Sequence, residues 1–338
     1  MPLNIVRQDI TKMKVDAIVN TTNEKMVGYS GVDLAVHNAA GPGLATECAK
    51  IAPLGLGTAK LTKGYNLVAN YIIHTSGPVW KGGLCGESII LKSCYMESLK
   101  LAEENNFNSI AFPLISSGAY GYPKDQVLKF AISVIKEFLN NHEMTVYLCV
   151  YNRNSYEFSR ELFRDISDFI NEDDVFACES APMAEAMPRL KMSIPKRTRP
   201  SAQMTSIQSS ENYEDESLHD YMQRMEKTFA YKLFDLIDEH GMTDVECYKK
   251  ANVDKKTFSK IKCNPDTYKP SKQTAVAFAI ALRLNLDETQ ELLATAGLTL
   301  SRSFTFDKII RYFIRRGIYD VFEINEALFE FDQVLLGC

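Results

Sequence analysis

The sequence predicts an α/β domain followed by an all-helical region, and two observations carry this prediction. Up to about Asp173, short apolar β-branched runs alternate with stretches of helical periodicity. From about Ser217 to the C-terminus, every periodic stretch has helical spacing. Alternating strands and helices are typical of a layered α/β domain with a parallel or mixed sheet. The chain of 338 residues has the length of two domains.

Composition places the chain among ordinary globular proteins. Hydrophobic residues make up 46% and charged residues 24% of the sequence, and the net charge is −5. Nothing global therefore indicates polyanion binding. The apolar runs are too short to span a bilayer, and the first residues lack the apolar core of a signal peptide. We expect a cytoplasmic protein with no membrane partner.

The cysteines and histidines do not indicate a metal site. The eight cysteines are scattered, with no CxxC pair, and the five histidines are equally dispersed. Free thiols in a reducing compartment are the simplest interpretation. We expect neither a metal nor another cofactor.

Strands are expected from mostly apolar runs, as in a sheet that is covered on both faces. These runs lie at residues 3–6, 16–19, 71–74, 109–115 and 145–151. Two amphipathic helices are indicated by residues that share one helical face, namely Leu91, Tyr95, Leu99 and Ala102, and Val127, Ala131, Val134 and Phe138. A closing helix is expected over residues 156–170.

Two glycine-containing loops are the first functional candidates, because each comes directly before an expected helix. Gly28 and Gly31 bracket a turn ahead of a helix over residues 32–40, and the sequence SGAYG (117–121) precedes a helix that begins near Lys124. Glycines let backbone amides approach a ligand closely, and a helix N-terminus supplies unpaired N–H groups. Together the loops predict a site for the two phosphates of a diphosphate. Each loop alone is equally well explained as a tight turn.

Four segments in order along the chain make its first part resemble a macrodomain, the module that binds ADP-ribose. They are QDIT (8–11), VNTTNEKMVGYSGVDLAVHNAAGP (19–42), GTAKLTKGYNLVANYIIHTSGPVW (57–80) and PLISSGAYGYP (113–123). Asn20 and Asn23, with Asp33 ten residues after Asn23, resemble the MacroD-type subclass. The resemblance covers about residues 2–172. It implies a three-layer α/β/α macrodomain with a mixed central sheet over residues 1–172.

The resemblance also implies an activity and a site. The MacroD-type subclass removes mono-ADP-ribose from acidic side chains and deacetylates O-acetyl-ADP-ribose, so the implied partner is ADP-ribose or a mono-ADP-ribosylated protein. The implied catalytic residues are Asp33, near the attacking water, and Asn23, on the distal ribose. The other implied ADP-ribose contacts are Asp9 and Ile10 at the adenine, Asn20, the first-loop residues Gly28, Tyr29, Ser30, Gly31 and Val32, the second-loop residues Ser116, Ser117, Gly118, Ala119 and Tyr120, and Tyr151 on the adenine ring.

Each of these assignments has a purely structural alternative. Asp33 in a first helical turn would complement the helix dipole, and Asn20 and Asn23 would satisfy backbone groups of a loop. The first loop also departs from the subclass, because Tyr29 and Ser30 interrupt its usual run of glycines. A non-catalytic reader of ADP-ribose therefore remains an alternative to the hydrolase.

After the α/β part, the pattern changes twice. Residues 173–217 contain four prolines and a polar stretch without periodicity, which predicts a flexible linker. Residues 218–338 predict a separate all-α domain. Its helices are expected at 221–239, 244–250, 255–262, 272–283, 287–296, 306–316 and 320–331.

Within this domain, residues 242–262 resemble a helix-turn-helix of the Cro/repressor type, a fold that places its second helix in the major groove. Thr243 and Asp254 are the expected N-caps of the two helices. Asp244 and Tyr248 stand where that family usually carries other residues. The alternatives are thus a protein-interaction domain, or a DNA-binding regulator that senses an ADP-ribose-type metabolite. The candidate nucleic-acid contacts are Lys255, Lys256, Lys260 and Lys262.

Overall fold

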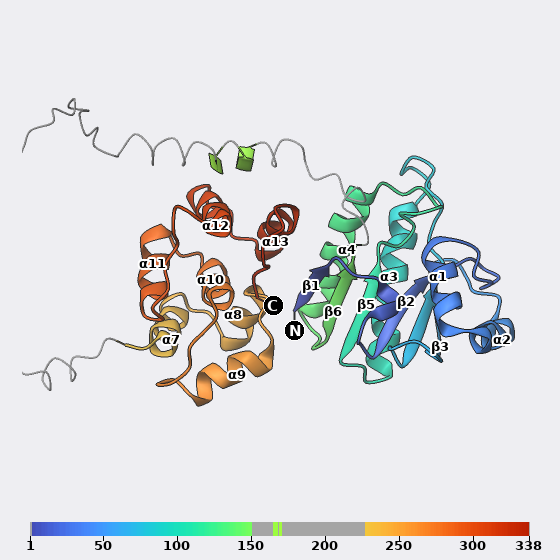
Figure 1. Ribbon diagram of the computed structural model, residues 1–338, viewed down its shortest axis with the longest axis horizontal. Helices are drawn as coiled ribbons and strands as arrows, with labels where there is room; N and C mark the ends of the chain where they lie inside the picture. The colour runs from blue at the N-terminus through green and yellow to red at the C-terminus, as the bar shows by residue number, and fades with distance from the viewer. Residues whose placement is uncertain (1, 151–164, 168, 171–226, 338) are drawn as a thin grey trace, which may run out of the picture.

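The computed structural model describes residues 2–150, 165–167, 169–170 and 227–337. A six-stranded sheet between helices forms the N-terminal part, and a set of helices lies beside it (Figure 1). The predicted linker and most of the predicted closing helix lie outside the described residues, so the proposed domain boundaries stay predictions. Among the described residues, no helix combines the length and the apolar character needed to cross a membrane.

The sheet is mixed. In spatial order its strands are β1 (Leu3–Val6), β6 (Thr145–Cys149), β5 (Ser109–Pro113), β2 (Ala17–Thr21), β4 (Tyr71–Thr75) and β3 (Ala59–Lys63). All neighbours are parallel except β3 and β4. The sequence did not predict β3, whose AKLTK segment has two lysines and mostly half-buried positions at the outer edge.

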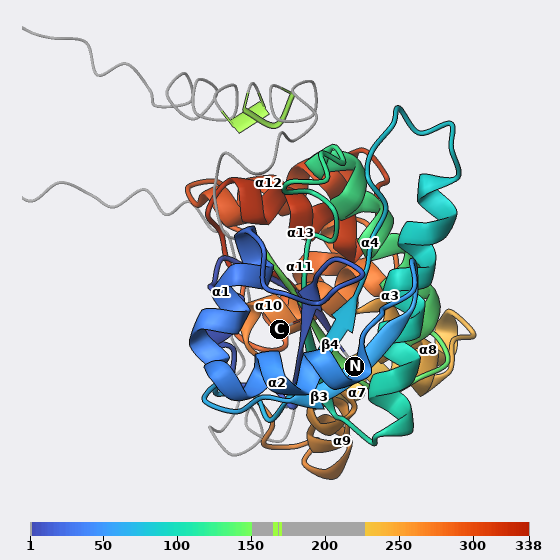
Figure 2. The same cartoon turned by 90° about the vertical axis from the view of Figure 1, so that its right-hand side faces the viewer.

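Helices cover both faces of the sheet. Helices α1 (Gly31–Ala40) and α2 (Pro42–Ile51) lie on one face, and α3 (Glu87–Glu104) and α4 (Lys124–Leu139) lie on the other (Figure 2). Along β2, Ile18 packs into the core of α1 and α2, whereas Ala17 and Val19 enter the core of α3 and α4. Successive strand residues point to opposite faces, so a strand that is apolar throughout needs cover on both. The expected three-layer architecture is confirmed.

The helical region contains seven described helices. They are α7 (Phe229–Glu239), α8 (Asp244–Lys250), α9 (Lys255–Cys263), α10 (Lys272–Ala281), α11 (Leu286–Ala294), α12 (Thr305–Arg315) and α13 (Val321–Glu330). Except at the start of α7, their ends fall within two residues of those predicted. Thr243 and Asp254 cap α8 and α9 as expected, with side chains that accept from the backbone N–H groups of Glu246 and Thr257.

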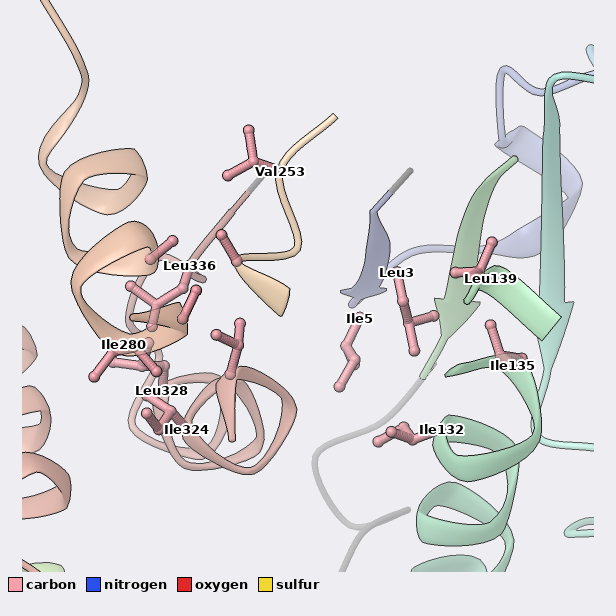
Figure 3. Close-up of a cluster of buried hydrophobic side chains, with 14 of the residues drawn as sticks. Leu3, Ile5, Ile132, Ile135, Leu139, Val253, Ile280, Ile324, Leu328 and Leu336 are labelled. Atoms are coloured by element: carbon pink, nitrogen blue, oxygen red, sulfur yellow. The ribbon is translucent and has the colours of Figure 1, made fainter. Parts of the chain in front are cut away.

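The helical region packs against β1 and α4. Figure 3 shows Leu3 and Ile5 of β1 and Ile132 of α4 on one side of the cluster, and Ile324 and Leu336 of the helical region on the other. All five side chains belong to one buried hydrophobic cluster that extends through both regions. The helical region is therefore separate in sequence and secondary structure but shares a core with the α/β domain.

Asn252, in the turn between α8 and α9, closes the free edge of the sheet. Its Oδ1 accepts from the Leu3 backbone N–H at 2.8 Å, and its Nδ2 donates to the Leu3 carbonyl at 3.0 Å. The side-chain amide thus replaces one residue of a neighbouring strand. An open edge strand leaves backbone groups unpaired, so this contact both satisfies and protects β1.

Candidate functional site

A cleft of about 560 Å³ opens where β2, β5 and β6 end. Two loops line it: the first loop, residues 22–30 before α1, and the second loop, residues 114–123 before α4. Open α/β sheets bind ligands at the carboxyl ends of their parallel strands. The sequence-predicted residues that line this cleft are Asn23, Tyr29, Ser30, Gly31, Val32, Asp33, Ser116, Ser117, Gly118, Ala119 and Tyr120.

The first loop leaves the start of α1 uncapped. Ser30 is the N-cap residue, but its side chain makes no capping hydrogen bond. The first backbone bond of the helix runs from Leu34 N to Ser30 O. The N–H groups of residues 31–33 consequently have no acceptor among the described residues, as expected for an uncapped helix N-terminus. Such N–H groups bind anions readily.

The second loop presents a comparable set of free amides. Ser117 turns the chain, since both its N–H and its hydroxyl donate to the Leu114 carbonyl, at 3.2 and 2.8 Å. The turn closes where Gly121 N donates to Gly118 O at 3.0 Å. Between these bonds, the N–H groups of residues 118–120 have no acceptor in the part of the chain that the structure describes. The cleft thus has amide donors on two sides.

Asp33 lies between the loops and is only 4% exposed. Its Oδ1 accepts from Asn20 Nδ2 at 2.8 Å, and its Oδ2 accepts from the Tyr29 backbone N–H at 3.0 Å. An ionised carboxylate has about four acceptor sites, so both oxygens can still accept from a water. The pKa of the Tyr120 phenol is raised, first by burial of the side chain and then by the negative charge of the nearby Asp33.

Behind Asp33, a buried polar chain fixes the orientation of Asn20. Asn20 Nδ2 lies 3.2 Å from His74 Nδ1, and His74 Nε2 lies 2.8 Å from the Thr62 hydroxyl. Burial, and to a lesser extent the neighbouring His37, lower the pKa of His74 to about 3. The ring is therefore neutral. Since the amide of Asn20 can only donate to it, we assign the proton to Nε2, which donates to Thr62.

Asn20 was expected to contact ADP-ribose, but it is fully buried and does not line the cleft. From β2, its side-chain amide donates to Asp33, and the expected contact with ADP-ribose stays a prediction. The sequence reasoning also missed His74 and Thr62. The available signal was a histidine within the otherwise apolar YIIHT strand, where a buried polar side chain needs a partner.

Gly28 is not among the residues that line the cleft, so its expected ligand contact stays a prediction, but the glycine has a clear structural role. Its φ is +66°, and a Cβ there would lie 2.7 Å from His37 Cγ. Only glycine therefore lets the first loop pack on His37. In turn, His37 Nε2 lies 3.7 Å from Asp33 Oδ1. The glycine supports the packing beneath Asp33.

Asn23 holds the first loop in shape and also lines the cleft. Its Oδ1 accepts from the backbone N–H groups of Lys25 and Met26, at 2.9 and 3.0 Å, which holds the first loop in a turn. The residue nevertheless lines both the cleft and a neighbouring cavity. Asn23 therefore satisfies backbone N–H groups of the loop, and its position beside the distal ribose remains a prediction.

At the other end of the cleft, Asp9 caps a short 3-10 helix (Ile10–Lys12) and accepts from both the N–H and the hydroxyl of Thr11, at 3.0 and 2.8 Å. Burial, and then the charge of Asp9, raise the pKa of the Cys149 thiol to about 12. Cys149 lines the cleft, so Asp9 lies near this end without lining it.

The Ile10 side chain is buried in the core of α1 and α2. Tyr151 lies outside the described residues.

Several residues that line the cleft were not among the ligand contacts predicted from the sequence. They come from the ends of three strands and the start of α4, and are Thr21, Thr22, Pro113, Leu114, Lys124, Cys149 and Val150. Lys124, the first residue of α4, adds a positive charge beside the second loop. No described group of His, Cys, Asp and Glu side chains is arranged to hold a metal ion.

The four candidate lysines of α9 are exposed, but two other residues of the helix-turn-helix already have side-chain partners within the protein. Lys262 forms an ion pair with Asp244 at 2.7 Å. The Tyr248 hydroxyl donates to Glu143 of the α/β domain at 2.9 Å. The two residues that depart from the repressor pattern thus have structural partners.

The fold and the two loops define an α/β ligand-binding domain, and comparison with known proteins identifies its family. The Macro domain family model matches residues 19–131, and the chain belongs to this family. A Macro domain-containing protein of Methanosarcina mazei is 51% identical over 155 residues, covering 45% of this chain and 83% of that protein. The O-acetyl-ADP-ribose deacetylase of Shigella dysenteriae is 39% identical over 167 residues, covering 47% and 94%. Human ADP-ribose glycohydrolase MACROD2 is 41% identical over 176 residues, covering 51% and 41%.

Proposed function

We propose that this protein hydrolyses mono-ADP-ribose from modified acidic side chains and also deacetylates O-acetyl-ADP-ribose. The observation that carries the proposal is Asp33, a buried carboxylate in a cleft lined by two loops of free amides. A site that only bound a diphosphate would gain nothing from a negative charge there, because the charge repels phosphate. The names of the two similar enzymes support the same activity.

Binding would depend mainly on the diphosphate. The free N–H groups of residues 31–33 and 118–120 can donate to its oxygens from two sides. The adenine would then extend toward Cys149 and Asp9, and the distal ribose would lie between Asn23 and Tyr120. Binding energy from the diphosphate and adenine would hold the scissile ester in place, so that positioning contributes to the rate.

Asp33 would act on the attacking water. The water donates a hydrogen bond to a free acceptor site of the carboxylate, and gives up its proton to Asp33 or to a substrate phosphate as it attacks. Cleavage releases the acid of the target side chain and leaves ADP-ribose in the cleft. Asn20 keeps Asp33 in place through the 2.8 Å hydrogen bond, and neutral His74 keeps Asn20 in place.

The test is turnover of a Glu-linked mono-ADP-ribosylated protein by the wild type and by Asp33→Ala. We expect micromolar binding of ADP-ribose, roughly −7 to −8 kcal/mol, in both proteins. Turnover should fall by about a hundredfold or more in the variant, the scale of general-base removal. An active Asp33→Ala protein would contradict the mechanism. Tight binding without turnover by the wild type would instead support a non-catalytic reader.

A second proposed function, contact with nucleic acid, is favoured by one observation. Lys255, Lys256 and Lys260 are exposed on α9, and none forms an ion pair within the described residues. Phosphate contacts by lysines make affinity fall steeply with salt. A gel shift with duplex DNA that weakens from 50 to about 200 mM salt would support it. A helical region that binds no DNA at low salt would leave a protein partner as the alternative.

We also propose that the protein acts in the cytoplasm. Six cysteines in the described segments are free thiols, four of them buried. Such use of cysteine is ordinary in a reducing compartment. Imaging of the tagged full chain in its own cell tests this localisation.

A further inference from the structure

A second cavity, of about 780 Å³, lies directly beside the cleft. The segment before β3, the segment after β4 and the start of α3 form its walls, and Leu56, Val79 and Ile90 are among its lining residues. Asn23 and Tyr120 line both the cavity and the cleft. The two spaces thus adjoin at the position where the distal ribose is proposed to lie.

Two large apolar side chains on the cavity wall are exposed. Leu56 is 58% and Val79 is 52% exposed, and both line the cavity. Leu84 and Ile89, from the neighbouring segment, are also exposed but do not line the cavity. A single exposed apolar residue needs no explanation, but two that line the same cavity indicate a surface that binds another molecule.

The cavity wall is held in shape by hydrogen bonds. Glu87, almost fully buried, accepts from the backbone N–H groups of Lys81, Gly83 and Cys85 at 2.9, 3.1 and 2.7 Å. Trp80 N donates to the Tyr120 carbonyl at 2.8 Å, which ties this wall to the second loop. The cavity is therefore preformed, and its position relative to the cleft is fixed.

We propose that this cavity binds the polypeptide segment that carries the ADP-ribosylated acid, with apolar residues next to the modified Asp or Glu. The inference rests on the proposed hydrolase function, because the bond to the target starts at the distal ribose, between Asn23 and Tyr120. Leu56 and Val79 supply apolar contacts to the flanking residues. Lys81 also lines the cavity and forms no ion pair among the described residues, so its charge can attract the carboxylate that hydrolysis releases.

Two variants and one matched control test the proposal in the full chain. Leu56→Asp and Val79→Asp place a charge on the cavity wall, whereas Ile89→Asp places the same charge on a neighbouring exposed position that does not line it. The substrates are a Glu-linked mono-ADP-ribosylated protein with apolar residues flanking the glutamate, and O-acetyl-ADP-ribose, which has no polypeptide.

For Leu56→Asp and Val79→Asp, kcat/KM for the modified protein should fall by about tenfold or more, the scale of a lost apolar contact. The value for O-acetyl-ADP-ribose should stay within about twofold, since only the polypeptide reaches the cavity. Ile89→Asp should change neither value. Unchanged turnover of the modified protein, or equal losses on both substrates, would overturn the proposal.

A binding measurement keeps this test separate from the test of hydrolysis. Combined with Asp33→Ala, which removes turnover, both cavity variants should weaken binding of the modified protein but not of free ADP-ribose. The retained ADP-ribose affinity shows that the variants are folded. If the wild type binds but hydrolyses neither substrate, the hydrolase function fails, and the difference in binding still decides whether the cavity holds the polypeptide.

Discussion

Helix α1 of the α/β domain and helices α8 to α11 of the helical region begin in different ways. Each of the latter has an N-cap side chain that accepts from a backbone N–H group of the first turn, and these caps are Thr243, Asp254, Ser271 and Asn285. Ser30 makes no such bond, although serine is a good capping residue. The N-terminus is thus capped by a side chain in these four helices and left uncapped in α1.

The missing cap is informative because of where it lies. Helices α2, α3, α7 and α12 also lack a side-chain cap, so this absence alone does not identify a site. At the cleft, however, the free amides of α1 occur together with those of the second loop and with the buried hydroxyls of Thr22 and Ser116, which have no hydrogen-bond partner among the described residues. Buried polar groups are normally hydrogen-bonded. Several unsatisfied groups at one cleft indicate that a ligand supplies their partners.

The largest expected effect is on stability, and it comes from Asn252 in the helical region. Asn252→Ala removes both hydrogen bonds to Leu3 and leaves two buried backbone groups unpaired, which should lower the free energy of unfolding by about 3 kcal/mol. Urea unfolding measures the loss. Asn264→Ala, which removes one exposed hydrogen bond to Lys260 O, is the matched control and should cost about 1 kcal/mol or less. If Asn252→Ala is no less stable than the control, Asn252 does not secure the edge of the sheet.

The next effect tests the polar chain beneath the cleft by its pH dependence. The folded pKa of His74 is about 3, below its ordinary 6.5, so between these values the unfolded chain binds more protons than the folded one. Stability should therefore fall on acidification below pH 6.5, with a share from His74 of about 1.4 kcal/mol per pH unit. The slope for His74→Gln should be shallower by about that amount between pH 6 and 4. Parallel slopes would mean that His74 is protonated in the folded state.

A smaller and more specific effect is expected when the N-terminus of α1 is given a side-chain cap. Ser30→Asp supplies a carboxylate to the α1 amides, which should raise stability by about 0.5–1 kcal/mol. The same carboxylate competes with the diphosphate, so ADP-ribose affinity should fall by about tenfold or more. Thermal unfolding and calorimetric titration measure the two changes. A stabilised variant that binds as well as the wild type would separate α1 from the diphosphate site.

The smallest effect comes from the reverse change in the helical region. Thr243→Ala removes a capping box, in which Thr243 and Glu246 satisfy one another's backbone N–H groups. The free energy of unfolding should fall by about 1 kcal/mol. ADP-ribose affinity should not change, because this helix start is far along the chain from the cleft and does not line it. A parallel loss of affinity would show that the two regions are coupled through their shared core.

The sequence predicted those features that depend on local pattern. Alternating apolar strands, helical periodicity, and the caps Thr243 and Asp254 were all visible, because each is set by neighbouring residues. The glycine loops before α1 and α4 likewise located the cleft. Strand β3 was missed because its half-buried edge position leaves a polar sequence, AKLTK, without a clear alternation.

What the sequence could not show depends on contacts between distant residues. Asn20 and Asp33 are close in sequence, but the role of Asn20 follows from His74, which only strand pairing brings beside it. The contact between Asn252 and Leu3 joins positions 249 residues apart. No local pattern records such a contact.

Calorimetric titration of the full chain with ADP-ribose and with adenosine tests most directly whether the free amides of the two loops bind a diphosphate. We predict saturable, micromolar binding of ADP-ribose, with adenosine weaker by about a hundredfold or more, because adenosine has nothing to place on the amides. No saturation at millimolar ADP-ribose, or equal affinity for the two ligands, would contradict the account.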